Sequence, residues 1–139
     1  METPQENQLR LLAEGYTAAW CSQEPASVAA FYSHDGSLQV NAGTPAVGRK
    51  AIEGIAQGFM TAFPDMKVIM NNLVVEGSRV IYHWTLVGTN TGPGGTGKRI
   101  RISGFEQWRI GADGLIAESQ GQFDAREYER QIQLGFTEP

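Results

Sequence analysis

The sequence has few of the residues that build metal centres and disulfides. Among its 139 residues there is one cysteine, Cys21, and there are two histidines. A single thiol excludes an internal disulfide, and so few sulfur and imidazole groups provide no zinc-like spacing. We therefore expect no metal site, and a reducing, cytoplasmic environment suits the chain best.

Excess positive charge and long apolar runs are also missing. Eleven basic residues stand against 15 acidic ones, and a net charge of −4 provides no electrostatic surface for nucleic acid. Residues 1–10 are polar and lack the apolar segment of a secretory signal, and no run approaches the roughly 18 apolar residues of a membrane span. We expect neither a nucleic acid nor a membrane as partner. The length and the 41% hydrophobic content fit one globular domain, residues 1–139.

The first half of the chain predicts three helices and one strand. Apolar residues at helical spacing indicate an amphipathic helix over 5–21, and Pro25 opens a short second helix. A third helix is predicted over 49–63. Before it, residues 34–36 (His-Asp-Gly) predict a turn that leads into a strand at 37–41.

From residue 66 onward the sequence is typical of strands. The predicted strands are 66–76, 79–90, 97–110 and 115–124, and a last helix follows at 125–134. The short joins indicate sequential antiparallel hairpins, and Asp124 is a suitable cap for the helix. This order predicts an α+β fold with helices grouped against one face of a curved meander.

Glu106 is the one ionisable group on the apolar face of a clearly alternating strand. The inward row of that strand is Ile100, Ile102, Gly104, Glu106, Trp108 and Ile110. A bare buried charge costs on the order of several kcal/mol, so this carboxyl must be paired, hydrogen-bonded or protonated. It is either a structural acid held by an arginine or by backbone donors, or a ligand-facing acid whose pKa desolvation raises toward neutrality. Gly104 leaves room for a ligand beside it.

Other candidates carry a structural and a functional interpretation. Tyr16 and Trp20 lie on the buried stripe of the first helix, either as plain core aromatics or with the Tyr16 hydroxyl offered to a ligand. Asn41 is either a turn residue at the rim of the first strand or a second ligand contact. Trp84 belongs to the inward row of its strand, which turns His83 outward.

Several motifs in the second half of the sequence resemble one known family. They are residues 82–84 (Tyr-His-Trp), 88–92 (Gly-Thr-Asn-Thr-Gly), 96–98 (Thr-Gly-Lys), 113–118 (Asp-Gly-Leu-Ile-Ala-Glu) and 131–135 (Gln-Ile-Gln-Leu-Gly). The pattern resembles the SnoaL-like polyketide cyclases of the nuclear-transport-factor-2-like superfamily. The resemblance implies a cone, in which a curved antiparallel sheet wraps around three helices from the N-terminal half and a short helix ends the chain. It also implies a pocket between them and dimerisation through the outer face of the sheet.

The resemblance further implies a cofactor-free reaction. In that family an Asp on the last strand is the general acid/base of an intramolecular aldol ring closure, helped by a His on the preceding strand. In this sequence the Asp position falls on Gly121 and the His position on Glu106. Strands that pair across the turn at 111–114 place residue 106 opposite 119–121, where facing Cβ atoms lie about 5 Å apart. A carboxylate missing at Gly121 can therefore be supplied by Glu106.

We thus expect a cofactor-independent enzyme that abstracts a proton next to a carbonyl of a hydrophobic small molecule. Glu106 is the predicted catalytic base, and the predicted substrate-binding residues are Tyr16, Trp20, Asn41, Trp84, Trp108 and Gly121. One alternative is a non-catalytic binding or association module on the same fold, since fold does not fix function. A second is an epoxide hydrolase-like enzyme, which needs an Asp, Arg, Asp set on adjacent strands. Phe105, in the outward row, predicts a homodimer.

Overall fold

Four helices and six strands make up residues 3–136, the part of the chain that the computed structural model describes. The ends of the predicted domain, 1–2 and 137–139, lie outside these residues. The helices are α1 (Pro4–Trp20), α2 (Pro25–Ala29), α3 (Arg49–Ala62) and α4 (Ala125–Leu134). The strands are β1 (Tyr32–Val40), β2 (Ala46–Val47), β3 (Lys67–Glu76), β4 (Arg79–Thr89), β5 (Arg99–Ile110) and β6 (Ile116–Phe123).

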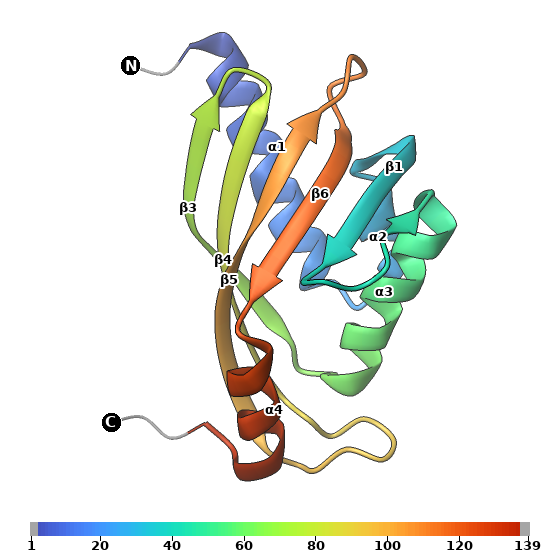
Figure 1. The fold of residues 1–139 in the computed structure, drawn as a ribbon, viewed down its shortest axis with the longest axis vertical. Coiled ribbons are helices and arrows are strands. Elements are labelled where there is room, and N and C mark those ends of the chain that lie inside the picture. The colour runs from blue at the N-terminus through green and yellow to red at the C-terminus, as the bar shows by residue number, and fades with distance from the viewer. Residues whose placement is uncertain (1–2, 137–139) are drawn as a thin grey trace.

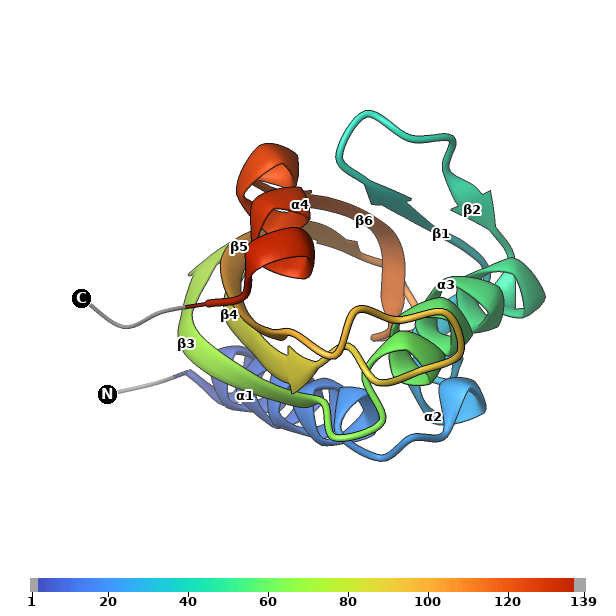
Figure 2. The same ribbon diagram turned by 90° about the horizontal axis from the view of Figure 1, so that it is seen from below.

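The strands form one curved sheet in the order β2-β1-β6-β5-β4-β3. The run from β3 to β6 is the predicted series of antiparallel hairpins, whereas β1 lies parallel to β6. The concave side of the sheet faces α1, α3 lies beside β1, and α2 packs against α1 and α3 (Figures 1 and 2). This arrangement confirms the predicted α+β fold, with a curved sheet around three helices of the N-terminal half and a short helix at the C-terminal end.

Local sequence signals determine where two of the helices begin. The Thr3 hydroxyl accepts a hydrogen bond from the Glu6 backbone N–H at 3.1 Å, and Pro4 occupies the first helical position of α1. Asp124 accepts from the backbone N–H groups of Arg126 and Glu127 at 3.0 and 3.1 Å, which confirms the predicted cap of α4. None of the helices within residues 3–136 is long and apolar enough to cross a membrane.

The first strand differs from its prediction. Residues 34–36 lie inside β1, although they carry the composition of a turn. Pairing with β6 shifts register between Tyr32 and Ser37, so a bulge absorbs these residues and leaves His34 exposed. Strand β2, which the sequence pattern did not predict, pairs with β1 through two residues. Tertiary pairing has overridden local turn preference here.

Helix α4 is hydrogen-bonded to the part of β5 that β6 does not cover. Strand β6 pairs with β5 only from Gly104 onward, so Arg101, which is paired with Val87 of β4 on one side, has no strand partner on the other. The Gln131 side chain replaces that strand, since its amide oxygen accepts from Arg101 N at 2.6 Å and its amide nitrogen donates to Arg101 O at 3.1 Å. Tyr128 of the same helix is thereby placed at the open end of the cone.

Candidate functional site

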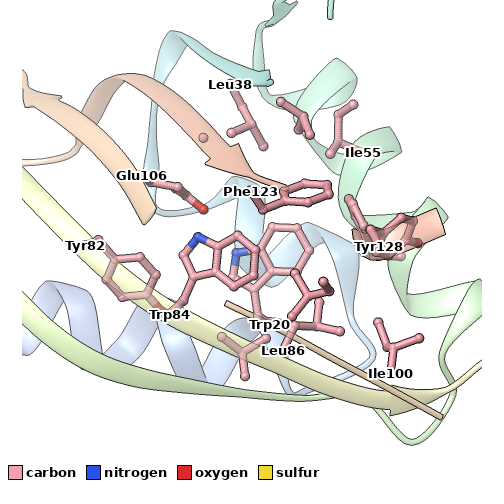
Figure 3. Close-up of a pocket in the computed structure, with 15 residues that line it drawn as sticks. Trp20, Leu38, Ile55, Tyr82, Trp84, Leu86, Ile100, Glu106, Phe123 and Tyr128 are labelled. Carbon is pink, nitrogen blue, oxygen red and sulfur yellow. The ribbon is translucent and has the colours of Figure 1, made fainter. Parts of the chain in front are cut away.

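An apolar cavity lies between the concave face of the sheet and helices α1, α3 and α4 (Figure 3). Its volume is about 60 Å³, several times the space that one water molecule needs. Its lining residues are Trp20, Leu38, Val40, Ile55, Phe59, Val68, Tyr82, Trp84, Leu86, Ile100, Ile102, Glu106, Gly121, Phe123 and Tyr128. Glu106 is the one carboxyl group in this set, which contains no lysine, arginine or histidine.

Three neutral donors surround one oxygen of Glu106. Its Oε1 atom accepts from the Tyr16 hydroxyl at 3.0 Å, from Trp108 Nε1 at 2.9 Å and from the Ser119 hydroxyl at 2.7 Å. Trp108 lies two residues further along β5 on the same face, and its ladder partner on β6 is Ser119. The buried carboxyl is therefore satisfied without an arginine, which replaces both structural arrangements considered from the sequence.

The donors are themselves held in place. Tyr16 and Tyr32 are completely buried, and their hydroxyl groups are 2.8 Å apart. Tyr16 also packs edge-on against Trp108, with ring centroids 5.2 Å apart. A donor fixed in this way loses little entropy when it bonds to Glu106, so the position of Oε1 is strongly determined.

The second oxygen of Glu106 has a different environment. Within residues 3–136 no group donates a hydrogen bond to Oε2, and this atom keeps some accessible surface although the residue as a whole is buried. Because Oε1 is surrounded by its donors and the carboxyl group lines the cavity, Oε2 is the oxygen that faces the cavity. Figure 3 shows the carboxyl group of Glu106 directed into this space. One oxygen is thus anchored and the other is open to a ligand.

Burial raises the pKa of the Glu106 carboxyl above its usual value, and the hydrogen bonds from Trp108, Ser119 and Tyr16 act in the opposite direction. Burial, followed by the charge of Glu106, also raises the pKa of the Tyr16 phenol well above its usual range. Tyr16 therefore stays protonated and remains a donor at any physiological pH. The result is a carboxyl that holds its proton more tightly than an exposed glutamate but can still ionise.

We expect Tyr16→Phe and Ser119→Ala each to raise the pKa of Glu106 further, because each removes a donor that favours the charged form. Loss of one such bond to a buried carboxylate costs about 1–3 kcal/mol of stability. The folded state then binds the proton more tightly than the unfolded state, so the added cost appears as pH rises through the raised pKa. An NMR titration of the Glu106 side-chain carboxyl carbon measures the shift.

Ser103→Ala is the matched control for these variants. The Ser103 hydroxyl lies on the outward row of β5 and contacts Thr85 at 2.7 Å, away from the cavity. Its removal should leave the titration of Glu106 unchanged. A pKa that falls or stays constant in Tyr16→Phe would show that the phenol does not stabilise the carboxylate.

Four of the residues selected from the sequence meet at this cavity. Glu106 and Gly121 face each other across the β5 and β6 ladder, at one end of the predicted range 119–121. Trp20 reaches the cavity from α1 and Trp84 from β4. The space beside Glu106 that Gly104 was expected to leave for a ligand is instead filled by the Trp84 indole, since a Cβ at position 104 would lie 2.7 Å from Trp84 Cζ2.

Three other selected residues lie elsewhere than expected. Tyr16 and Trp108 are behind Glu106 and not among the lining residues, because their polar hydrogens are bonded to Oε1. Asn41 is a structural turn residue: its φ is 52°, its Oδ1 accepts from Phe123 N at 2.9 Å and its N–H donates to Gly121 O at 2.8 Å. It joins β1 to β6 and does not line the cavity.

Sequence reasoning missed Ser119 and Tyr32. Ser119 lies inward on β6, and the predicted pairing of position 106 with 119–121 already contained the signal that it could reach Glu106. Tyr32 begins β1, five residues before the start of the strand predicted at 37–41. Its role depends on the parallel pairing of β1 with β6, for which the sequence offers no local signal. Residues 3–136 contain no group of three or more His, Cys, Asp or Glu side chains suited to a metal ion.

Solved structures with the same fold include proteins described as cyclases and isomerase-like. A candidate SnoaL-like polyketide cyclase from Jannaschia sp. CCS1 is 17% identical with a TM-score of 0.84, covering 98% of this chain and 99% of the other. A ketosteroid isomerase-like protein from Catenulispora acidiphila, solved with trimethylamine, is 17% identical with a TM-score of 0.78, covering 91% and 97%. The epoxide hydrolase/cyclase-like enzyme SalBIII is 14% identical with a TM-score of 0.74, covering 89% and 95%.

These identities are low enough that the structural likenesses establish the fold alone. No curated protein matches the chain in sequence. The family model for SnoaL-like polyketide cyclases, however, matches residues 10–132, which include every strand and the residues around Glu106. The chain therefore belongs to the SnoaL-like polyketide cyclase family.

Proposed function

We propose that this protein is a cofactor-independent enzyme that removes a proton next to a carbonyl of a hydrophobic small molecule, with Glu106 as general base. The observation that carries the proposal is the asymmetry of the carboxyl group. Three donors hold Oε1, whereas Oε2 faces an apolar cavity and accepts no hydrogen bond from residues 3–136. A purely structural acid would have both oxygens satisfied by the protein. The raised pKa of Glu106 suits a base that works near neutral pH.

The proposed reaction begins when Oε2 takes a proton from the carbon next to the carbonyl. The electron pair of the broken C–H bond moves into the carbon–carbon bond of an enolate, and negative charge develops on the carbonyl oxygen. In a ring closure the enolate carbon then attacks a second carbonyl of the same molecule, and the alkoxide that forms takes the proton back from Glu106. The donors at Oε1 keep the carboxyl in one orientation through both proton transfers.

The test does not require the natural substrate. The bicyclic ketone 2-tetralone has acidic hydrogens beside its carbonyl, and their exchange for deuterium in D₂O is followed by proton NMR. We expect the protein to accelerate this exchange over buffer alone. The rate should fall at acidic pH, as Glu106 becomes protonated and can no longer act as a base. Binding of 2-tetralone without any acceleration would instead favour the non-catalytic binding module.

The epoxide hydrolase alternative has less support from the cavity. That chemistry needs two carboxylates and an arginine, but the cavity lining within residues 3–136 contains Glu106 as its one carboxyl and no arginine. The likeness to SalBIII, at 14% identity, concerns the fold alone. The family resemblance assigns an acid to position 121, which is glycine in this chain. Apart from Glu106, none of the lining residues carries a carboxyl group.

We also propose that the protein is a homodimer, assembled through the outer face of the sheet. Phe105 lies half-buried on that face, beside its ladder partner His83 with ring centroids 6.1 Å apart. Sedimentation should give a dimer for the wild type and a monomer for Phe105→Glu, because the charge would have to be buried at the interface. A wild-type monomer at micromolar concentration would contradict the proposal. The cytoplasmic location stays a prediction.

A further inference from the structure

The indole N–H of Trp84 is the one fully buried side-chain nitrogen or oxygen without a hydrogen-bond partner in residues 3–136. Buried donors are nearly always satisfied in folded proteins, because an unpaired one costs about 1–3 kcal/mol. Trp84 also lines the cavity that Glu106 faces. An orphaned donor at a ligand cavity indicates that a ligand supplies the missing acceptor.

The sheet places this donor close to the open oxygen of Glu106. On the ladder between β4 and β5, Tyr82 is opposite Glu106 and Trp84 is opposite Gly104, so Trp84 and Glu106 are diagonal neighbours on the concave face. Diagonal neighbours have Cα atoms about 7–8 Å apart, with Cβ atoms somewhat closer, so both side chains can contact the same small ligand. Figure 3 shows the Trp84 ring beside the Glu106 carboxyl group. No direct hydrogen bond joins the two side chains.

The orientation of the Trp84 ring is fixed before any ligand binds. The ring lies over Gly104, where a Cβ would be 2.7 Å from Trp84 Cζ2. Phe123 packs against it edge-on, with ring centroids 5.9 Å apart. A donor held in this way needs no reorganisation when charge develops on an oxygen in front of it.

The remaining walls restrict the charge of the ligand. The lining contains no cationic side chain, so a carboxylate or phosphate group would be buried beside Glu106 without a counter-charge. Aromatic walls and one carboxylate could also hold an ammonium cation, but such a cation has no acceptor for the Trp84 N–H. One donor and one acceptor, close together in an apolar cavity, match an uncharged ketone with hydrogens on the adjacent carbon.

We infer that Trp84 Nε1–H binds the carbonyl oxygen of the substrate and stabilises the enolate that forms there. This inference rests on the proposed function of Glu106 and adds the group that accepts the developing charge. The carbonyl oxygen points to Trp84, while the hydrogen on the adjacent carbon points to Glu106 Oε2. As the proton leaves for Oε2, the N–H bond to the enolate oxygen strengthens.

The first experiment compares a ketone with the matching hydrocarbon. Calorimetry gives the affinities of 2-tetralone and of tetralin, which lacks the oxygen, for the wild type, Trp84→Phe and Trp20→Phe. We expect the wild type to prefer the ketone and Trp84→Phe to lose about tenfold of that preference, as for one buried hydrogen bond. Trp20→Phe removes the same indole group from another wall of the cavity, so it should weaken both ligands alike.

The second experiment observes the hydrogen bond itself. The infrared C=O stretch of bound 2-tetralone should lie at lower frequency in the wild type than in Trp84→Phe, a change that altered packing alone would not produce. Should Trp84→Phe fail to fold, benzothienylalanine incorporated at position 84 replaces N–H by sulfur in nearly the same shape. An unchanged stretch and an unchanged ketone preference in either variant would overturn the inference, as would tighter binding of tetramethylammonium than of 2-tetralone.

These readouts separate the inference from the proposed function. Failure of Glu106 as a base would appear as exchange that does not depend on Glu106, while the ketone preference and the shifted stretch persist. Failure of Trp84 would appear as a normal stretch in an enzyme whose exchange still requires Glu106.

Discussion

Glu106→Gln should lower the rate of deuterium exchange in 2-tetralone by about 10²–10⁴-fold, the usual contribution of a general base. Glutamine is the informative replacement because of how the carboxyl is held. Its amide oxygen can occupy the place of Oε1 and keep the bonds from Tyr16, Trp108 and Ser119. Its NH₂ group then takes the place of Oε2 and cannot accept a proton, so the variant should fold normally while losing the base.

Glu76→Gln makes the same chemical change at an exposed position near the end of β3, outside the cavity. It should exchange at the wild-type rate, and both variants should show wild-type circular dichroism. Full activity in Glu106→Gln would remove the base from the proposal. Loss of activity together with loss of fold would instead identify Glu106 as a structural residue.

The second large effect is expected at Gly121, the position to which the family resemblance assigns the acid. Gly121→Asp should destabilise the protein by on the order of several kcal/mol at neutral pH, since it buries a second carboxylate beside the first. The backbone permits the change: a Cβ at position 121 would lie 3.4 Å from Gln39 O and 3.6 Å from Glu106 Cγ, which are ordinary contacts. The cost is therefore electrostatic in origin.

The sign of the pH dependence follows from the repulsion. Two close carboxyl groups hold a shared proton more tightly than they would in the unfolded chain, so the stability of Gly121→Asp should fall as pH rises through that raised pKa. Gly121→Asn has nearly the same size without the charge, so it should keep only the smaller slope that the raised pKa of Glu106 already causes in the wild type. Thermal unfolding in mildly acidic and mildly basic buffer measures both. Equal slopes would mean that the side chain at position 121 does not enter the space occupied by Glu106.

Much of this site could be predicted from local patterns. Strict alternation along β5 identified the inward row, and the short turn to β6 placed position 106 opposite 119–121; in the structure its partner is Gly121. The cap at Asp124 likewise predicted the limits of α4. These features depend on residues close together in the chain, where periodicity and turn chemistry are informative.

The features that could not be predicted depend on distant segments. Nothing near Tyr16 indicates that its hydroxyl bonds to Glu106, 90 positions further along the chain. The parallel pairing of β1 with β6 draws residues 34–36 into a strand despite their turn composition. The orphaned N–H of Trp84 depends on the packing of several side chains, and an amino-acid pattern does not encode whether a particular donor is left without a partner.

The facing of Glu106 and Gly121 across one ladder has a wider meaning for relatives of this chain. Side chains at positions 106 and 121 enter the same part of the cavity from the adjacent strands β5 and β6. An acid can therefore reach that space from either strand without any change of the backbone. A sequence signature that requires the acid on β6 would miss chains that carry it on β5. Such chains are better compared by where the carboxyl group lies in the cavity than by the residue at one position of a sequence alignment.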